Sequence, residues 1–361
     1  MSTPNDEFEK FRGTMPVQER LRIDADRLAL YLRDYIPDFP ASITLEQFKG
    51  GQSNPTYLIT AGERRFVMRR KPPGNLLPSA HAVDREYRVM TALAGTDVPV
   101  PRTWCLCEDV SIVGTAFFVM DFVQGRVFWD PALPGITPPE RSEIWGEINR
   151  VIAALHTVDY RAVGLETYGR SSGYIQRQID RWSKQYRSSE TERIEAMDNL
   201  IDWLPKNIPP GDETTIVHGD FRIDNVIFHP TQPRVLAVLD WELSTLGHPL
   251  ADFAYHLMAW RLGPGQFRGM NGVDFNALGI PTEAEYTARY CERTGRANVG
   301  NVDFYLAYNM FRLAAILQGI AKRAIDGTAS NAQAVETGKR ARPTAEAGWG
   351  LAERIIANGN R

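Results

Sequence analysis

The sequence predicts a two-lobed α+β fold, in which a lobe built on an antiparallel sheet precedes a mostly helical lobe. The chain has 361 residues, and single hydrophobic cores stop growing beyond about 250 to 300 residues. Short alternating segments separated by turn residues fill the stretch from residue 43 to residue 123, and apolar spacing of three and four residues prevails from residue 139 onward. We therefore predict a first lobe over residues 1–123 and a second over residues 124–361.

The first lobe opens with a polar lead-in, a helix and an antiparallel meander. Residues 1–22 have the composition of a loosely ordered segment. Apolar residues at helical spacing predict a helix over residues 24–35, which Pro37 ends. Alternating apolar residues between turn signals then predict a five-stranded antiparallel sheet. The predicted strands lie at residues 43–45, 57–60, 66–69, 103–107 and 116–123.

One further helix is predicted within the first lobe, over residues 84–93. Tyr87, Met90 and Leu93 recur at three-residue spacing and form its inward stripe. Glu86 lies on the same helix, where it either pairs with a cation of the sheet or is one more solvated helix charge.

The second lobe is predicted to be mostly helical because the apolar period changes after Pro139. His156 lies in the first of these helices, where a lone histidine is more often a hydrogen-bonded packing residue than a ligand. Residues 327–345 are polar and predict a connection between helices. The other predicted helices lie at residues 174–187, 191–204, 249–260, 281–293, 302–325 and 349–356.

Composition excludes several classes of protein. Lysine and arginine total 41 against 44 acidic residues, a net charge of -3, which does not fit a nucleic-acid binder. The three cysteines form no disulfide or zinc framework and favour a reducing compartment. No apolar run approaches the roughly 18 residues of a membrane span. We therefore expect a cytoplasmic protein, and its oligomeric state stays open.

The most specific signal is the spacing of two acids and an amide. Asp220 follows a β-branched run, and Asn225 returns to the same cleft after one turn. Residues 235–239 read as a short buried strand whose end presents Asp240 to that cleft. Transfer of a γ-phosphoryl group needs a carboxylate to orient the acceptor and oxygen ligands for magnesium, and these three residues fit those roles. Taken alone, His218 reads more often as a loop-packing residue.

The pattern from His218 to Asn225 resembles the H-x-D-x-x-x-x-N catalytic loop of the aminoglycoside phosphotransferase and choline kinase branch of the kinase-like fold. The resemblance implies a bilobal protein-kinase-like fold with Asp220 as the catalytic aspartate. It implies Asn225 and Asp240 as magnesium ligands and His218 as the residue that braces the loop. Arg222 stands two residues after Asp220, where protein kinases place a lysine that contacts the phosphate.

A glycine-rich turn precedes the second predicted strand. Gly50, Gly51, Ser53 and Asn54 resemble the G-G-x-S-N loop that comes before the phosphate-contacting strand in this family. Glycines there allow positive φ, so amide hydrogens from Gly51 to Asn54 could point at phosphate oxygens. By itself, a Gly-Gly turn is more often an ordinary hairpin turn.

The resemblance also implies how ATP is held. Arg69 occupies the place where many kinases keep a lysine, and Glu86 is its implied ion-pair partner. A guanidinium is a planar fork rather than a compact charge, so this departure bears on activity. The run that ends with Asp121, Phe122 and Val123 resembles the kinase hinge, whose main-chain atoms bond to adenine.

A later aspartate is predicted to support the catalytic loop. Asp252 lies near the start of the helix predicted at residues 249–260, where a carboxylate is stabilised by the helix dipole and unpaired amides. It matches the family aspartate that holds the loop in place. His248 departs from the Gly-Asp-Pro sequence that family members often have here.

The catalytic-loop motif does not identify the molecule that accepts the phosphoryl group. Residues 301–361 contain eight basic and five acidic side chains, which disfavours a polycationic aminoglycoside. The local sequence resembles the kinase-like domain joined to acyl-CoA dehydrogenases at residues 70–74, 80–81, 85–87 and 241–245. That resemblance implies a hydroxylated acyl or acyl-CoA acceptor.

We therefore predict an ATP- and Mg-dependent phosphotransferase that phosphorylates a hydroxyl of a small molecule. Two alternatives stay open. Arg69 in place of lysine suits a nucleotide-binding scaffold without catalysis. A metal-dependent hydrolase would use His218, Asp220 and Asp240, but further histidines at ligand spacing are lacking. The sequence does not decide between ATP and GTP.

Overall fold

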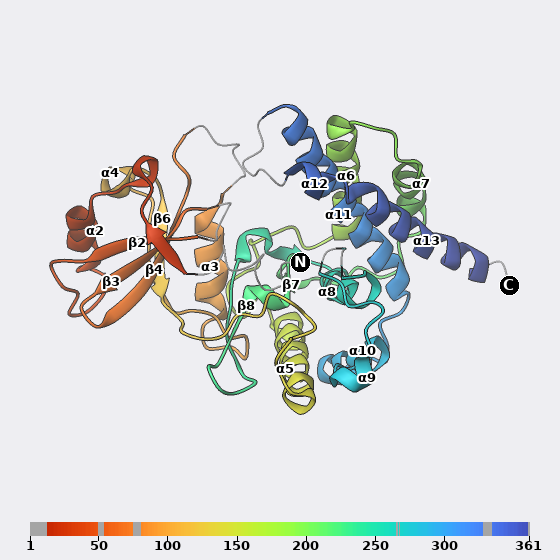
Figure 1. The fold of residues 1–361 in the computed structure, drawn as a ribbon, viewed down its shortest axis with the longest axis horizontal. Coiled ribbons are helices and arrows are strands. Elements are labelled where there is room, and N and C mark those ends of the chain that lie inside the picture. The colour runs from red at the N-terminus through yellow and green to blue at the C-terminus, as the bar shows by residue number, and fades with distance from the viewer. Residues whose placement is uncertain are drawn as a thin grey trace. The chain divides into compact units, whose positions relative to one another are not determined.

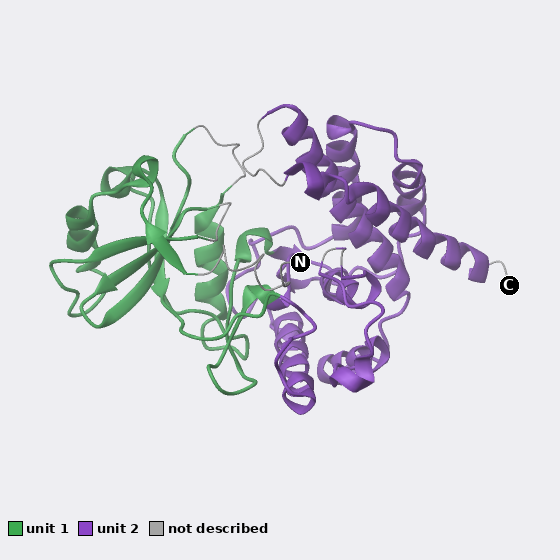
Figure 2. Cartoon of the chain, viewed as in Figure 1, with its two compact units in different colours: residues 1–129, 224–244 green, residues 130–223, 245–361 purple. Residues whose placement is uncertain are grey.

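The computed structural model describes residues 13–49, 54–74, 81–264, 266, 268–327 and 334–359 (Figure 1). The chain divides into two compact units (Figure 2). Unit 1 contains residues 1–129 and 224–244, and unit 2 contains residues 130–223 and 245–361. The sequence-based boundary lay after residue 123, and the segment 224–244 was assigned to the second lobe. By contacts, this segment belongs with unit 1.

Unit 1 is built on an antiparallel sheet that has six strands among the described residues, in the order β1-β2-β3-β4-β6-β5. The prediction of five antiparallel strands holds, but the prediction of a loosely ordered lead-in is wrong for residues 14–16. These residues form β1, because Met15 pairs with Gln47 at the edge of the sheet. The strands are β1 (Thr14–Pro16), β2 (Thr44–Phe48), β3 (Thr56–Ala61), β4 (Arg64–Arg70), β5 (Thr103–Cys107) and β6 (Phe117–Asp121).

Helices cover both faces of this sheet (Figure 1). Helix α2 (Ala25–Leu32) and the short helix α4 (Val110–Val113) pack on one face, in a core that includes Phe66 and Met68. Helix α3 (Val83–Leu93) contacts β5 and β6. The two predicted helices of the first lobe are thus confirmed. The last five residues of β4, Phe66 to Arg70, are all buried, so both faces of this strand are covered. A 3-10 turn, η1 (Glu19–Leu21), precedes α2.

Residues 224–244 form a hairpin attached to unit 1. Strands β8 (Val226–Phe228) and β9 (Val235–Val238) pair antiparallel, between the 3-10 turns η3 (Ile223–Asn225) and η4 (Trp241–Leu243). Arg126 and Phe228 exchange two backbone hydrogen bonds of 2.8 Å each. A Cβ on Gly125 would lie 2.1 Å from the Phe228 carbonyl oxygen, so only glycine allows this close approach.

Unit 2 is mostly helical, as predicted, with one two-stranded ribbon. Helix α11 (Val302–Ile325) is its centre and packs against five other helices, α6, α7, α8, α12 and α13. The ribbon pairs β7 (Thr215–Val217) with β10 (Thr245–Gly247). The remaining helices are α5 (Pro138–Thr157), α6 (Tyr174–Ser189), α7 (Glu195–Trp203), η2 (Leu204–Lys206), α8 (Pro249–Arg261), α9 (Phe275–Leu278), α10 (Glu283–Thr294), α12 (Ala334–Gly338) and α13 (Ala341–Gly359).

The predicted polar connection at residues 327–345 is wrong for most of its described part. Residues 334–338 are helical, and α13 begins at Ala341 rather than at Trp349. Ala334, Ala341 and Ala345 are buried, because α12 and α13 both pack against α11 through small side chains. None of the helices formed by the described residues is long and apolar enough to cross a bilayer.

Candidate active site

The segment that carries Asp220 is a tight loop held by one buried carboxylate of the same unit. It follows β7, whose three residues are all buried. Gly219 has a φ of 83°, a left-handed conformation that favours glycine. Asp252 accepts the N–H of His218 at Oδ2 and the N–H of Gly219 at Oδ1, each at 2.8 Å. The predicted supporting role of Asp252 is therefore confirmed.

Tyr255 and Arg222 both contact the carboxylate of Asp220. The Tyr255 hydroxyl donates to Oδ1 at 2.5 Å, and Arg222 Nη1 lies 3.0 Å from the same oxygen. The Asp220 N–H donates to Nδ1 of His218 at 3.2 Å, so His218 braces the loop through its ring. His218 is fully buried, and Asp220 keeps a partly exposed side chain.

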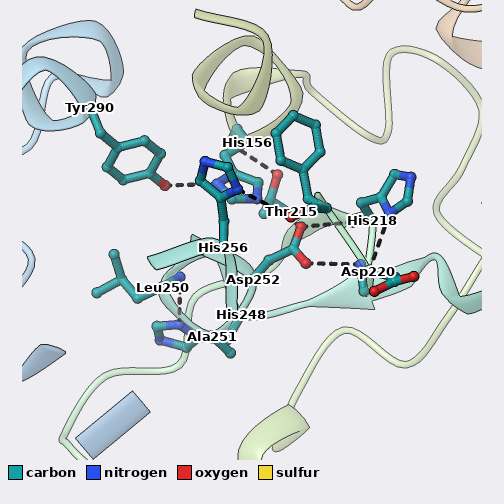
Figure 3. Close-up of polar contacts among 12 residues, drawn as sticks. His156, Thr215, His218, Asp220, His248, Leu250, Ala251, Asp252, His256 and Tyr290 are labelled. Carbon is teal, nitrogen blue, oxygen red and sulfur yellow. Dashed lines mark hydrogen bonds and ion pairs between the residues drawn. The ribbon is translucent and has the colours of Figure 1, made fainter. Parts of the chain in front are cut away.

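Asp252 is the centre of a buried polar network (Figure 3). His156 Nε2 lies 3.2 Å from Asp252 Oδ2, and His156 Nδ1 lies 2.7 Å from the Tyr290 hydroxyl. Burial acts to raise the pKa of Asp252, but its interactions with His156 and then with His218 together outweigh burial, so the pKa is lowered. The carboxylate is thus kept ionised, which suits an acceptor of two loop N–H groups. His156 is a core residue, as predicted.

A second histidine makes the stability of unit 2 sensitive to acid. His256 Nδ1 lies 3.2 Å from the Phe221 carbonyl oxygen, and burial lowers the pKa of His256 from 6.5 to about 4. The unfolded chain then binds a proton that the folded chain does not. The stability due to His256 is present above pH 6.5 and is lost as the pH falls through about 4.

We expect the free energy of unfolding to fall by up to about 3 kcal/mol between pH 7 and pH 4 through this residue. Urea unfolding at several pH values measures it, and His256→Gln should show a flatter dependence. His248, whose pKa burial also lowers to about 4, continues to contribute in that variant. His229→Gln, at a partly exposed histidine, is the control and should keep the wild-type slope. Equal slopes for His256→Gln and wild type would contradict the assignment.

Asn225 comes just before β8 and Asp240 comes just after β9, so both lie at the open end of the β8–β9 hairpin in unit 1. Val226 pairs with Val238, and the Asn225 carbonyl accepts the Leu239 N–H at 2.8 Å. Asp240 has a φ of 66°, a left-handed conformation that aspartate adopts more readily than most other residues do. The hairpin therefore brings one amide and one carboxylate to the same end.

Arg69 connects this end of the hairpin to helix α3. Its Nη1 lies 2.9 Å from Glu86 Oε2 and 3.1 Å from Asp240 Oδ1, and its Nη2 lies 3.8 Å from Glu242 Oε2. The Glu86 side chain is 1% exposed, so the alternative of a solvated helix charge is wrong. Asn54 Nδ2 donates to the other carboxylate oxygen of Glu86 at 3.1 Å. The implied Arg69–Glu86 pair is thus present.

Three carboxylates, those of Glu86, Asp240 and Glu242, lie beside the single guanidinium of Arg69. Burial raises the pKa of Glu86 to about 7, Asp240 and Glu242 add to the rise, and Arg69 acts against it. Carboxylate and amide oxygens are the ligands that Mg²⁺ prefers, so Asp240 and Asn225 fit that ion.

Histidine, cysteine, aspartate and glutamate form no group of three or more that could hold a metal within the described part of the chain. This arrangement gives no support to the alternative of a zinc hydrolase built on His218, Asp220 and Asp240.

The glycine-rich turn falls largely outside the described residues, which omit Gly50, Gly51 and Ser53. Asn54 is described and fully buried. The Asn54 side chain forms hydrogen bonds with Glu86 and with His81. Nδ1 of His81 lies 3.1 Å from Asn54 Oδ1. Any contact from Asn54 to a phosphate would therefore come from its backbone.

The predicted hinge leaves β6 at Asp121. The N–H groups of Asp121 and Phe122 donate to the carbonyls of Arg102 and Arg65 at 2.8 and 3.3 Å. Trp104 Nε1 also donates to Asp121 Oδ1 at 2.6 Å. The Val123 N–H has no hydrogen-bond partner among the described residues. Of the three hinge amides, Val123 is the one that could donate to a base.

Comparison with known proteins places this geometry in a family. The model of the phosphotransferase enzyme family (APH) matches residues 44–288, more than half of the chain. The chain belongs to the phosphotransferase enzyme family. This family model covers the whole stretch from Arg69 and Glu86 through the Asp220 loop to Asp252.

Curated relatives of this phosphotransferase-family chain are much longer proteins. Acyl-CoA dehydrogenase family member 10 of Mus musculus is 48% identical over 344 residues, which are 94% of this chain and 32% of that protein. Acyl-CoA dehydrogenase family member 11 of Rattus norvegicus is 41% identical over 97% of this chain and 46% of that protein. The chain thus spans from 32% to 46% of the length of these two relatives.

Solved structures give the same fold. A crystal structure from Ralstonia eutropha JMP134, of a protein provisionally named an aminoglycoside phosphotransferase, is 58% identical, covers 92% of this chain and 99% of that chain, and has a TM-score of 0.86. Choline kinase of Cryptosporidium parvum is 13% identical over 93% of this chain and 97% of that chain (TM-score 0.65). Aminoglycoside phosphotransferase APH(4)-Ia, in a ternary complex with AMP-PNP and hygromycin B, is 16% identical over 91% of this chain and 99% of that chain (TM-score 0.59). The chain therefore has the bilobal kinase-like fold that the resemblance implied.

The structure of this phosphotransferase-family chain groups the predicted site residues into two sets. His218, Asp220 and Arg222 lie together in unit 2. Arg69, Glu86, Asn225, Asp240 and the predicted hinge, Asp121, Phe122 and Val123, lie in unit 1.

Sequence reasoning missed Glu242 and Tyr255. Glu242 stands two residues after Asp240, so a second acid near the aspartate predicted to bind magnesium was the available signal. Tyr255 stands three residues after Asp252 in α8, on the helix face that already contacts the loop.

Proposed function

We propose that this phosphotransferase-family protein is an ATP- and Mg-dependent kinase that phosphorylates a hydroxyl of a small molecule. The proposal rests mainly on the contacts that hold the side chain and the loop of Asp220. Its carboxylate is held by Tyr255 and Arg222, on a loop whose backbone Asp252 fixes. Positioned groups of this kind are what phosphoryl transfer requires of a protein, because little covalent chemistry is left for it.

In the proposed reaction, Asp220 orients the acceptor hydroxyl and takes its proton. A bond forms between the acceptor oxygen and the γ-phosphorus of ATP, and the bond from that phosphorus to the β–γ bridging oxygen breaks. ADP leaves with the electron pair of that bond. Arg222, whose Nη1 lies 3.0 Å from Asp220 Oδ1, would meet negative charge on the transferred group.

Asn225 and Asp240 would hold magnesium in this proposal. The bound ion supplies charge neutralisation on the phosphates. Arg69, fixed by Glu86, steadies the nucleotide phosphates together with backbone amides of Gly50, Gly51, Ser53 and Asn54. The main chain of residues 121–123 receives adenine. The ternary complex of APH(4)-Ia with AMP-PNP supports a nucleotide donor for this fold.

For the acceptor we propose a hydroxyacyl or acyl-CoA-type molecule. The names of the curated relatives, acyl-CoA dehydrogenase family members 10 and 11, support this class. The charged neighbours of the Asp220 loop in unit 2 include Arg222 and Arg312, and the Arg312 Nη2 donates to the Gly219 carbonyl at 2.9 Å. Two guanidinium groups beside the loop disfavour a polycationic acceptor such as an aminoglycoside.

A panel assay tests the proposal. The purified chain is incubated with γ-labelled ATP and Mg²⁺ against hydroxyacyl thioesters, hydroxy acids, amino alcohols, sugars and aminoglycosides. We expect label in a hydroxyacyl thioester and none in the aminoglycosides. Label in an aminoglycoside alone would overturn the proposed acceptor class. Absence of label from every organic acceptor would count against the kinase.

A nucleotide-binding scaffold without catalysis is the second candidate. The observation in its favour is that Arg69 replaces the usual lysine and contacts Asp240, which is the proposed magnesium ligand. A ligand at 100 times its Kd stabilises the folded protein by about 2.7 kcal/mol. Stabilisation by Mg·ATP of this size without a phosphorylated product would favour the scaffold.

A further inference from the structure

Helix α8 contacts the Asp220 loop with three side chains from one face. Asp252 accepts two loop N–H groups, and His256 Nδ1 lies 3.2 Å from the Phe221 carbonyl oxygen. Tyr255 lies between them in sequence and contacts the side chain of Asp220 rather than the loop backbone. Residues three and four apart share a helix face, so Tyr255 extends a contact that Asp252 begins.

The contact from Tyr255 is short and directed. Its hydroxyl lies 2.5 Å from Oδ1 of Asp220, within the range of hydrogen bonds to a charged oxygen. Arg222 reaches the same oxygen from the loop itself, at 3.0 Å. Two donors on one oxygen restrict the orientation of the carboxylate.

Tyr255 is itself held in place. It is 7% exposed, and the guanidinium of Arg312, on α11, lies 5.3 Å from its ring centroid. Arg312 also donates to the Gly219 carbonyl, so one arginine contacts both the tyrosine and the loop. Burial, and then the charge of Asp220, raises the pKa of Tyr255 well above its ordinary value. The hydroxyl therefore stays protonated and acts as a donor.

We infer that Tyr255 is a positioning residue for phosphoryl transfer, whose hydroxyl holds the Asp220 carboxylate in the orientation that receives the acceptor. This inference rests on the proposed function and assigns a role to a residue outside the catalytic-loop motif. Arg312 supports the tyrosine from its ring face. The arrangement predicts that the hydroxyl matters for turnover and little for nucleotide binding.

Tyr255→Phe tests the inference because it removes the hydroxyl and keeps the ring that packs against Arg312. A hydrogen bond to a charged group is worth enough to change a rate by roughly 10- to 100-fold. We expect kcat to fall by that factor, with the KM for ATP within about twofold of wild type. In an Asp220→Asn background the same substitution should have almost no further effect, because the carboxylate that the hydroxyl positions is already absent.

The matched control is Tyr186→Phe, at a fully buried tyrosine on α6 of the same unit that has no contact with the loop among the described residues. It should leave kcat unchanged. The thermal midpoint of each variant reports whether folding is affected. Tyr255→Phe with wild-type kcat, or a loss equal in the Asp220→Asn background, would overturn this inference alone. Absence of transfer by the wild-type protein would refute the proposed function, and this inference with it.

Discussion

Replacing Asp220 by asparagine is expected to lower kcat for phosphoryl transfer by about 10²- to 10⁴-fold, the usual cost of losing a positioned general base. Asparagine keeps the size of the side chain and can still accept from Tyr255 and Arg222, so the loop should stay in place. What is lost is the carboxylate that accepts the hydroxyl proton. Initial rates with saturating ATP and acceptor measure the effect.

The affinity for Mg·ATP should change little in this variant, because Asp220 is assigned to the acceptor and not to the nucleotide. Calorimetric titration with AMP-PNP and Mg²⁺ measures that affinity. Asp202→Asn, at an exposed acid on α7 of the same unit, is the control and should keep wild-type turnover. Turnover within a few fold of wild type in Asp220→Asn would remove Asp220 from the catalytic role.

Replacing Arg69 by methionine is expected to destabilise the protein by about 3 to 5 kcal/mol, the usual cost of removing one partner of a buried ion pair. The Arg69 side chain is 11% exposed, and Glu86 would remain buried without its counter-charge. Asp240 and Glu242 would also lose their contact with the guanidinium. Urea unfolding followed by circular dichroism measures the loss.

The destabilisation should grow with pH. The folded-state pKa of Glu86, about 7, lies above its ordinary 4.5, so its contribution to stability is present below pH 4.5 and is lost as the pH rises through about 7. Without Arg69, which opposes this rise, ionisation of Glu86 becomes costlier. The difference in unfolding free energy between wild type and Arg69→Met should therefore be larger at pH 8 than at pH 5.

A double variant separates charge from packing. Arg69→Met with Glu86→Gln removes both charges of the buried pair and should recover part of the loss at pH 8. Arg69→Lys restores the charge without the planar fork and should be less destabilising than methionine. A methionine variant as stable as wild type at both pH values would show that the pair contributes nothing to folding.

The helices of unit 2 were predictable because their apolar periodicity is local. Helix α11 spans Val302–Ile325, the range predicted from sequence, since nearly every turn of it buries apolar side chains. Strand β1 was not predictable, because its three residues pair with β2 across 30 or more positions and carry no pattern of their own. Helix α12 and the start of α13 were missed because alanine and glycine pack on α11 without a long apolar stripe.

Within the site, sequence spacing predicted the contacts between residues that are joined by one hairpin or by a strand and the helix that follows it. Asn225 and Asp240 come together because one hairpin joins them, and Glu86 meets Arg69 through the helix that follows its strand. Tyr255 contacts Asp220 across 35 positions, which only the packing of α8 against the loop determines. The contact of Arg69 with Glu242 is likewise a result of how the hairpin is seated in unit 1.

The ratio of products in one reaction tests the central claim most directly. With an acceptor found in the panel, ADP and phosphorylated acceptor are quantified together over time, for the wild-type protein and for Asp220→Asn. We predict equal amounts of the two products from the wild type and almost none of either from the variant. ADP that appears with free inorganic phosphate and no phosphorylated acceptor, or equal transfer by both proteins, would contradict the account.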